Sequence, residues 1–208
     1  GALKKSDLAR VTVDTTVQPK NITFPTDAKL LLVAIQQLGK LAKEYDVPLR
    51  QSYARVAKRA AIKVGRYAHA KQFKRMNREI KFLRTRLGRV TRDIRRKTMG
   101  DEALAAAFAV PLIKASQIRG QKQRQRGWKL YSWHAPETEC IAKGKAHKPY
   151  EFGVKVSLTT TNKRAKGGQF ILHAKALPGN PYDGHTLAEV LAETQALTGR
   201  EIERVYVD

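Results

Sequence analysis

Valine alternates with polar residues near the start of the chain, which is the period-2 pattern of a β-strand built from β-branched residues. Residues 10–18 place three valines on one face of this strand and Asp14 on the other. A second run of this kind, at residues 202–207, lies at the far end of the chain and leads directly into Asp208. A carboxylate in a core strand is costly to bury unless something compensates its charge. Two such aspartates, far apart in sequence, therefore predict a metal site that folding assembles.

The first helical pattern lies between Thr26 and Pro48. Apolar residues from Leu30 to Tyr45 recur at spacings of three and four, so they fall on one face of an α-helix. Thr26 is suited to cap the N-terminus of this helix, and Pro48 breaks it. We therefore predict a helix with one buried face.

A longer helical pattern follows, in which apolar residues step alternately by three and four over three heptads. These residues are Phe73, Met76, Ile80, Leu83, Leu87, Val90 and Ile94. Such a seam predicts packing along a partner helix. Gly100 ends the pattern, a shorter apolar helix is predicted at residues 101–116, and residues 117–127 are predicted to be a mobile basic linker.

The pattern changes to strands after residue 127. Residues 128–133 are predicted to form a strand, and a polar loop follows as far as Pro149. Residues 152–160 and 169–177 alternate like strands on either side of a glycine-containing turn, which predicts a β-hairpin.

A last helix is predicted between Thr186 and Gly199. Thr186 and Glu189 have the spacing of a capping box, and Gly199 is suited to end the helix. Five apolar or small residues, Leu187, Val190, Leu191, Thr194 and Leu197, form its predicted buried stripe. Asp183, just before this helix, is explained by helix capping. Because the helix links the third strand to the last, parallel pairing within the sheet is plausible.

Together these elements predict an α/β fold with a mixed sheet flanked by helices. Residues 1–25 and 128–208 form the sheet core of a single partial domain. Residues 26–127 form a large, basic, all-helical insertion after the first strand.

The net charge of the chain indicates what kind of partner it binds. The chain of 208 residues has 41 Lys and Arg against 18 Asp and Glu, a net charge of +23 and a pI of about 10.4. Between residues 50 and 97 there are 18 basic residues, and the acidic residues are Glu79 and Asp93. One interpretation is a solvated, charged face of a helical hairpin. We favour phosphate contacts, because this many like charges repel one another without an anionic partner.

The predicted DNA contacts come from these helices, the basic linker and the hairpin turn. They are Arg55, Lys58, Arg59, Lys74, Arg75, Arg78, Arg84, Arg92, Arg95, Arg96, Arg124, Arg126, Lys163 and Arg164.

No apolar run approaches the roughly 18 residues that a spanning helix needs, so we expect no membrane partner. A signal-peptide pattern is absent from the start of the chain. The single cysteine, Cys140, fits a reducing cytosol. Because the chain begins with Gly1 and ends on an aspartate after a strand, we expect a fragment.

Five stretches resemble bacterial insertion-sequence transposases of the DDE type, in order along the chain. They are VDTTVQPK at 13–20, FPTDAKLL at 24–31, YEFGVKV at 150–156, LPGNPYDGHTL at 177–187 and VYVD at 205–208. The resemblance implies a ribonuclease H-like sheet interrupted by an insertion. It also implies that Asp14 and Asp208 match the first and second catalytic aspartates of the family. The family's third acidic residue, a glutamate on a later helix, has no match here, so this fragment is expected to be inactive alone.

The implied activity is cleavage of DNA at transposon ends and strand transfer into target DNA, with Mg²⁺ or Mn²⁺ in a two-metal site. The implied partners are double-stranded DNA and further copies of the chain, in the nucleoid-associated cytoplasm of a bacterium. Parallel neighbouring strands lie about 4.8 Å apart, so aspartates at matching levels would repel unless cations lay between them. Two Mg²⁺ ions about 3.5–4 Å apart suit phosphoryl transfer.

Other interpretations remain open. Asp14 could be an edge-strand residue satisfied by backbone amides, and Asp208 could be a cap or turn residue. A non-catalytic nucleic-acid-binding protein of ribosomal or nucleoid type would share the basic surface. A nuclease of the same fold would share the carboxylates but would lack strand transfer.

Overall fold

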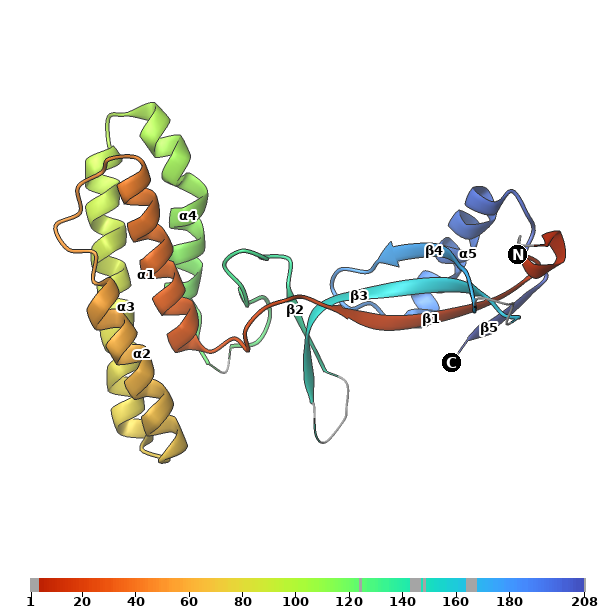
Figure 1. The fold of residues 1–208 in the computed structure, drawn as a ribbon, viewed down its shortest axis with the longest axis horizontal. Helices are drawn as coiled ribbons and strands as arrows, with labels where there is room; N and C mark the ends of the chain where they lie inside the picture. The colour runs from red at the N-terminus through yellow and green to blue at the C-terminus, as the bar shows by residue number, and fades with distance from the viewer. Residues whose placement is uncertain (1–3, 124, 143–146, 148, 164–167, 208) are drawn as a thin grey trace. The chain divides into compact units, whose positions relative to one another are not determined.

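The chain folds into two units, each with its own core (Figure 1). The computed structural model describes residues 4–123, 125–142, 147, 149–163 and 168–207. The sheet unit comprises the described residues of 1–21 and 137–208, and the helical unit comprises those of 22–136. The chain therefore leaves the sheet unit once, forms the helical unit and returns.

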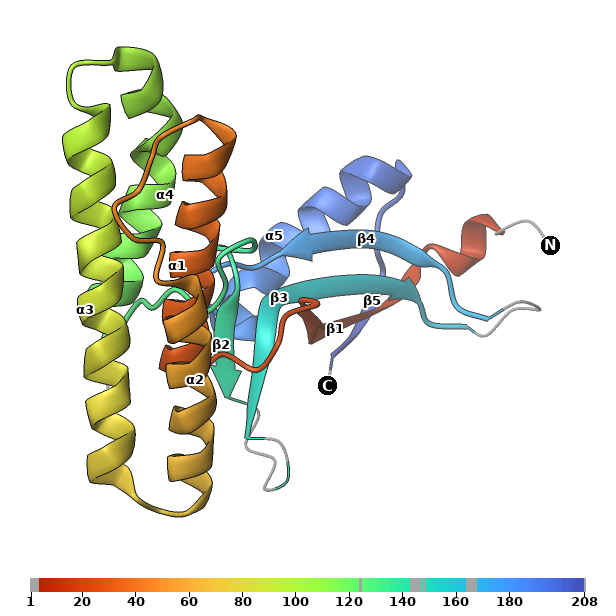
Figure 2. The same cartoon turned by 60° about the vertical axis from the view of Figure 1, so that its left-hand side comes forward.

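In the helical unit, α3 is the helix that contacts each of the other three. Its helices are α1 (Asp27–Glu44), α2 (Ala54–His69), α3 (Phe73–Thr98) and α4 (Glu102–Gly120). The long α3 packs against α1, α2 and α4, as Figure 2 shows. The buried apolar residues of all four helices form one continuous core.

The apolar spacing along α3 explains this packing. Leu83, Leu87 and Ile94 are fully buried, whereas Phe73 at the first position of the seam is 56% exposed. The predicted heptad seam is thus confirmed apart from its first residue. Burying each of these large aliphatic side chains contributes about 1.5–3 kcal/mol.

Local caps set the starts of α1 and α4. The Thr26 hydroxyl accepts a hydrogen bond from the Lys29 backbone N–H at 3.3 Å, which confirms the predicted cap. The Asp101 carboxylate accepts one from the Leu104 backbone N–H at 2.9 Å. Each cap satisfies an N–H that would otherwise have no partner within the helix.

Two predictions near the end of the helical unit are wrong. Residues 117–120 belong to α4 rather than to a linker, and residues 128–133 form no strand. Gln121 supplies the physical reason for the second difference. Its buried side-chain amide donates to the Leu130 carbonyl and accepts from the Leu130 N–H, both at 3.2 Å. Because one amide satisfies both backbone groups, Leu130 packs into the helical core without a neighbouring strand.

The sheet unit contains a mixed sheet, which confirms the α/β class. Its strands are β1 (Arg10–Pro19), β2 (Glu139–Ala142), β3 (Tyr150–Thr161), β4 (Ile171–Ala176) and β5 (Arg204–Val207). The order is β2-β3-β1-β5, and β4 also pairs with β3. β1 runs antiparallel to β3 and parallel to β5, and β3 runs antiparallel to β2 and β4. The hairpin prediction is confirmed, whereas β2 was missed.

The alternation along β1 is also confirmed. Val11, Val13 and Val17 are buried, and Asp14 is exposed. Val11 and Val13 form a core cluster with Val190 of α5 (Asp183–Thr198), so α5 covers this face of the sheet. Asp14 is therefore on the opposite face of β1 from the valines that α5 covers.

The start of α5 corrects the predicted capping box. Tyr182 is the N-cap residue, and Thr186 lies inside the first turn, where its hydroxyl donates to the Asp183 carbonyl at 3.0 Å. Leu197 is 70% exposed rather than part of the buried stripe. Gly199 ends the helix as predicted, with φ of 62°, a left-handed conformation that glycine adopts without strain.

Among the described residues, no helix combines the length and apolar character that crossing a membrane would require.

Candidate metal centre and nucleic-acid interface

The parallel pairing of β1 with β5 determines the surroundings of Asp14. In this register Val11 lies opposite Val205, and Val13 lies opposite Val207. The two paired residues Val13 and Val207 are the ones that directly precede Asp14 and Asp208 in the sequence. Asp208 itself lies outside the described residues, so the structure describes one of the two predicted ligands.

Asp14 borders a cavity of about 190 Å³ at the end of this strand pair. The cavity is also lined by Thr15, Ser157, Asp183 and Thr186, from β1, β3 and α5. Within the described part of the chain, no hydrogen-bond donor or basic side chain contacts the Asp14 carboxylate. An exposed carboxylate that none of the described residues engages, in a chain of net charge +23, is available to bind a cation.

Asp183 is a second carboxylate at this cavity, and it is engaged. Its Oδ1 lies 2.5 Å from the Lys155 Nζ, and its Oδ2 accepts a hydrogen bond from the Thr15 hydroxyl at 3.1 Å. Lys155 also donates to the Pro181 carbonyl at 2.8 Å. These contacts connect the first turn of α5 to β1 and β3 at the cavity that Asp14 also lines.

Sequence reasoning missed this role of Asp183. No side chain makes a capping hydrogen bond at the start of α5, so helix capping does not explain the residue. The signal that could have pointed to it is Lys155. This lysine shares the inward face of β3 with Ser157 and Thr159, which are buried. A lysine on such a face needs a carboxylate partner, although the strand pattern does not say which one.

The acidic residues further along α5 are occupied by basic partners. Glu189 and Glu193 lie 2.8 and 2.6 Å from the Lys175 Nζ, and Glu193 also lies 3.1 Å from the His173 Nε2. The hydrogen bond from Lys175 holds the pKa of the Glu193 carboxyl below its usual value. The hydrogen bonds to Glu189 and Glu193 raise the pKa of Lys175.

A complete metal-ligand set does not occur in the described residues, where no group of three or more His, Cys, Asp or Glu side chains could hold an ion.

Most of the predicted DNA contacts are exposed on the helical unit. Those on α2 and α3 with exposed side chains are Arg55, Lys58, Arg59, Lys74, Arg75, Arg78, Arg92, Arg95 and Arg96. Arg126 in the helical unit and Lys163 in the sheet unit are exposed as well. Arg124 and Arg164 lie outside the described residues.

Arg84 is placed differently from the other predicted contacts. Its Nη2 donates to the Gln121 carbonyl at 2.8 Å and lies 3.4 Å from the Asp27 carboxylate. Two-thirds of the side chain is shielded from solvent. These contacts connect α3 to α1 and to the end of α4, so Arg84 has a structural role in addition to any contact with DNA.

Comparisons with known proteins give a partial relative. The chain is similar to the "Uncharacterized protein ORF8 in nfe locus" of Rhizobium meliloti, with 56% identity over 73 residues. This match spans 35% of the present chain and about one third of the length of that relative. No protein-family model matches the chain. No solved structure matches it either.

Proposed function

We propose that the chain is part of the catalytic domain of a DDE-type transposase with a ribonuclease H-like sheet. The proposed activity is metal-dependent cleavage at transposon ends and strand transfer into target DNA. Support comes from the five sequence stretches described above and from the topology. Apart from the short β2, which pairs with the start of β3, the sheet consists of the antiparallel strands β1, β3 and β4, followed in the chain by α5 and by β5, which pairs in parallel with β1. That order, β4-β3-β1-β5, is the one expected for the first four strands of a ribonuclease H-like sheet.

The observation that carries the proposal is the register of β1 and β5. Parallel neighbours lie about 4.8 Å apart, and the residues preceding Asp14 and Asp208 are paired. Carboxylate oxygens are the ligands that Mg²⁺ and Mn²⁺ prefer, and Asp14 has no competing partner among the described residues. Asp14 and Asp208 would therefore hold the metal. When bound, two such ions supply the positive charge that activates the attacking oxygen and stabilises the leaving one.

The helical unit supports DNA as the partner. Its helices α2 and α3 cover most of residues 50–97, where 18 basic residues accompany two acidic ones. Glu79 lies 3.9 Å from Lys63, and Asp93 pairs with Arg96 and Lys97, so these two carboxylates leave most of the positive charge uncompensated. A surface of this kind binds phosphates, with an affinity that falls steeply as salt rises. Joining two transposon ends would require a second copy of the chain.

Manganese binding to variants of the full chain tests the proposal. Asp14→Asn removes one ligand charge and should weaken Mn²⁺ binding, measured by calorimetry, by at least about tenfold. Glu201→Gln is the control, because it removes an exposed carboxylate from the same unit, away from the cavity. Equal Mn²⁺ affinity in both variants would refute the metal centre. If DNA binding then persisted in both, the chain would be a non-catalytic nucleic-acid-binding protein.

A further inference from the structure

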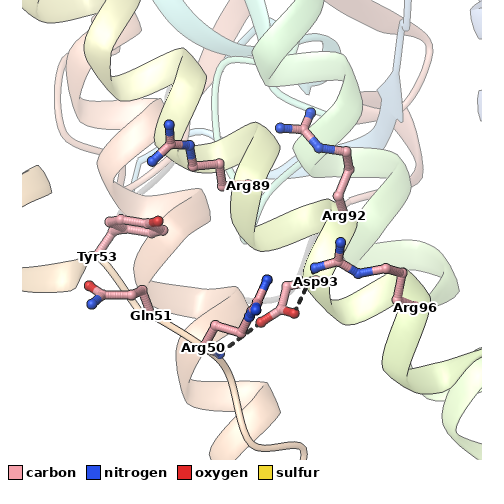
Figure 3. A pocket seen from close by; sticks show the side chains of 7 residues that line it. All are labelled: Arg50, Gln51, Tyr53, Arg89, Arg92, Asp93 and Arg96. Atoms are coloured by element: carbon pink, nitrogen blue, oxygen red, sulfur yellow. Dashed lines mark hydrogen bonds and ion pairs between the residues drawn. The ribbon is translucent and has the colours of Figure 1, made fainter.

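A cavity of about 300 Å³ in the helical unit is lined mainly by arginines. Figure 3 shows the lining side chains, which come from α3 and from the loop between α1 and α2. They are Arg50, Gln51, Tyr53, Arg89, Arg92, Asp93 and Arg96. The cavity lies within one unit of the structure, outside the sheet and its candidate metal centre.

Helical spacing and one buried aspartate bring these arginines together. Arg89, Arg92 and Arg96 follow one another at spacings of three and four, so they share one face of α3. Asp93 is only 6% exposed, and its carboxylate accepts hydrogen bonds from the Arg50 backbone N–H at 2.8 Å and from Arg96 at 3.1 Å. Asp93 therefore fixes the loop that carries Arg50 against α3.

The pKa of Asp93 is consistent with this anchoring role. Burial raises it, but the hydrogen bonds from Arg50 and Arg96, together with the charge of Lys97, lower it by more. Asp93 is thus ionised and already engaged by its own neighbours. The charge of Asp93 therefore holds the Arg50 loop and the Arg96 side chain in the wall of the cavity.

The remaining charges of the cavity are uncompensated. Among the described residues, the guanidinium groups of Arg50, Arg89 and Arg92 make no hydrogen bond or ion pair. Guanidinium groups stay protonated in proteins, so the cavity carries three positive charges in excess of its one carboxylate. Tyr53, which also lines the cavity, is the N-cap residue of α2, and a helix N-terminus adds further positive potential. The cavity is therefore suited to an anion.

We propose that this cavity binds a phosphate group of the DNA backbone. The inference rests on the proposed function, which supplies DNA as the partner. Arginine favours phosphate because its planar guanidinium donates two parallel hydrogen bonds to a pair of phosphate oxygens. A DNA backbone is the expected source, because α2 and α3 expose further arginines and lysines beyond the cavity, such as Arg55 and Arg95. Neighbouring phosphates of the same strand can contact those residues.

Charge-removing variants of the full chain test the proposal. Arg92→Gln and Arg89→Gln each remove one guanidinium from the cavity. Both residues are exposed and make no bond to the described residues, so helical content and melting temperature should not change. Lys81→Gln is the matched control, because Lys81 is an exposed cation on α3 that does not line the cavity.

Two probes are titrated in EDTA buffer at about 50 mM salt: pyrophosphate and a labelled duplex of about 20 base pairs. Each arginine variant should weaken pyrophosphate and duplex binding about tenfold, the loss expected for a hydrogen bond between charged groups. Lys81→Gln should leave pyrophosphate binding unchanged and weaken duplex binding by no more than about threefold, as one diffuse charge would. That pattern supports the proposal.

Two other patterns overturn it. Equal losses of duplex affinity in all three variants would mean that the basic surface acts as diffuse charge without a phosphate site. Pyrophosphate binding that depends on Arg92, with duplex affinity indifferent to Arg92→Gln, would assign the cavity to a free phosphate compound instead of DNA. Because EDTA removes divalent metal, this outcome is independent of the Mn²⁺ test with Asp14→Asn. A failure of either proposal can therefore be recognised separately.

Discussion

Removing the two partners of the Lys155–Asp183 ion pair, one at a time, should destabilise the sheet unit by unequal amounts. Lys155 is 13% exposed, whereas the Asp183 side chain is 57% exposed. Asp183→Asn leaves a largely buried ammonium without its counter-charge, with the Pro181 carbonyl as its remaining partner. Lys155→Met removes the buried charge and leaves a carboxylate that water can hydrate. We therefore expect Asp183→Asn to destabilise the unit more than Lys155→Met.

The exposed fractions of the two side chains determine how much stability each substitution should remove. Exposed ion pairs contribute about 0.2–1 kcal/mol, whereas breaking a fully buried pair costs about 3–5 kcal/mol. With one partner buried and the other half-exposed, Asp183→Asn should cost about 1–2 kcal/mol, and Lys155→Met should cost less than about 1 kcal/mol. The cost of about 1–2 kcal/mol for Asp183→Asn corresponds to roughly a 5- to 30-fold change in an opening equilibrium.

Hydrogen exchange of β3 and α5 is the suitable assay, because local opening of the sheet unit appears there directly. Both tryptophans, Trp128 and Trp133, belong to the helical unit, so their fluorescence reports on the other core. The two variants and their double mutant form a cycle, and a second cycle on Lys63 and Glu79, followed by hydrogen exchange of α2 and α3, is the control, since that pair is 3.9 Å apart and Lys63 is 56% exposed. An equal cost for Lys155→Met and Asp183→Asn would contradict the predicted asymmetry. Equal coupling energies in the two cycles would contradict it as well.

Four further predictions concern the two units and the response to acid. Leu87→Ala removes a fully buried side chain of α3 and should lower the free energy of unfolding by about 2–5 kcal/mol. Denaturant unfolding followed by tryptophan fluorescence measures this loss. Phe73→Ala, at a 56% exposed position of the same helix, should lower the free energy of unfolding by less than about 1 kcal/mol. Gly153→Ala would place a Cβ 2.1 Å from a backbone oxygen of β1, so it should disrupt the pairing of β1 with β3 and abolish amide protection there. Gly65→Ala, a helical position with open space around it, should instead raise the stability of the helical unit by about 0.5–1 kcal/mol, which thermal melting can check. Because the pKa of Asp93 is lowered on folding, its contribution is present above its unfolded value of 3.8 and is lost as pH falls through the lower folded value. Asp93→Asn should therefore reduce the loss of helical-unit stability below about pH 4, and an unchanged acid transition would contradict this assignment.

The spacing of apolar residues correctly predicted the strand and the helix in which one face is buried. The alternating valines of β1 and the heptad seam of α3 face the cores that their spacing demands. The helix between the hairpin and β5 made parallel pairing plausible, and β5 does pair in parallel with β1. These features follow from short-range patterns of apolar residues.

The elements that were missed depend on contacts between residues far apart in sequence. β2 has four residues, too few for a clear alternation, and it pairs with the first residues of β3. The strand predicted at residues 128–133 is absent because Gln121 satisfies the backbone of Leu130. α5 begins at Asp183, whose partners Thr15 and Lys155 lie on other strands.

The same distinction applies to the candidate sites. Asp14 was identified because its strand is a local pattern and because the surrounding residues resemble a family motif. That Asp183 lines the same cavity as Asp14, and that Arg50 converges with Arg89 and Arg92, can be seen only in the folded chain. Net charge predicted a basic surface but not which basic residues would line a cavity.

The proposed function requires Asp14 and Asp208 to share a divalent metal at the end of the β1–β5 pair. The most direct test is a crystal of this chain soaked in Mn²⁺, with the ion located by anomalous scattering. We predict a peak within about 2–2.5 Å of carboxylate oxygens of both aspartates. Carboxylates too far apart to share an ion, with no peak between them, would contradict the transposase mechanism.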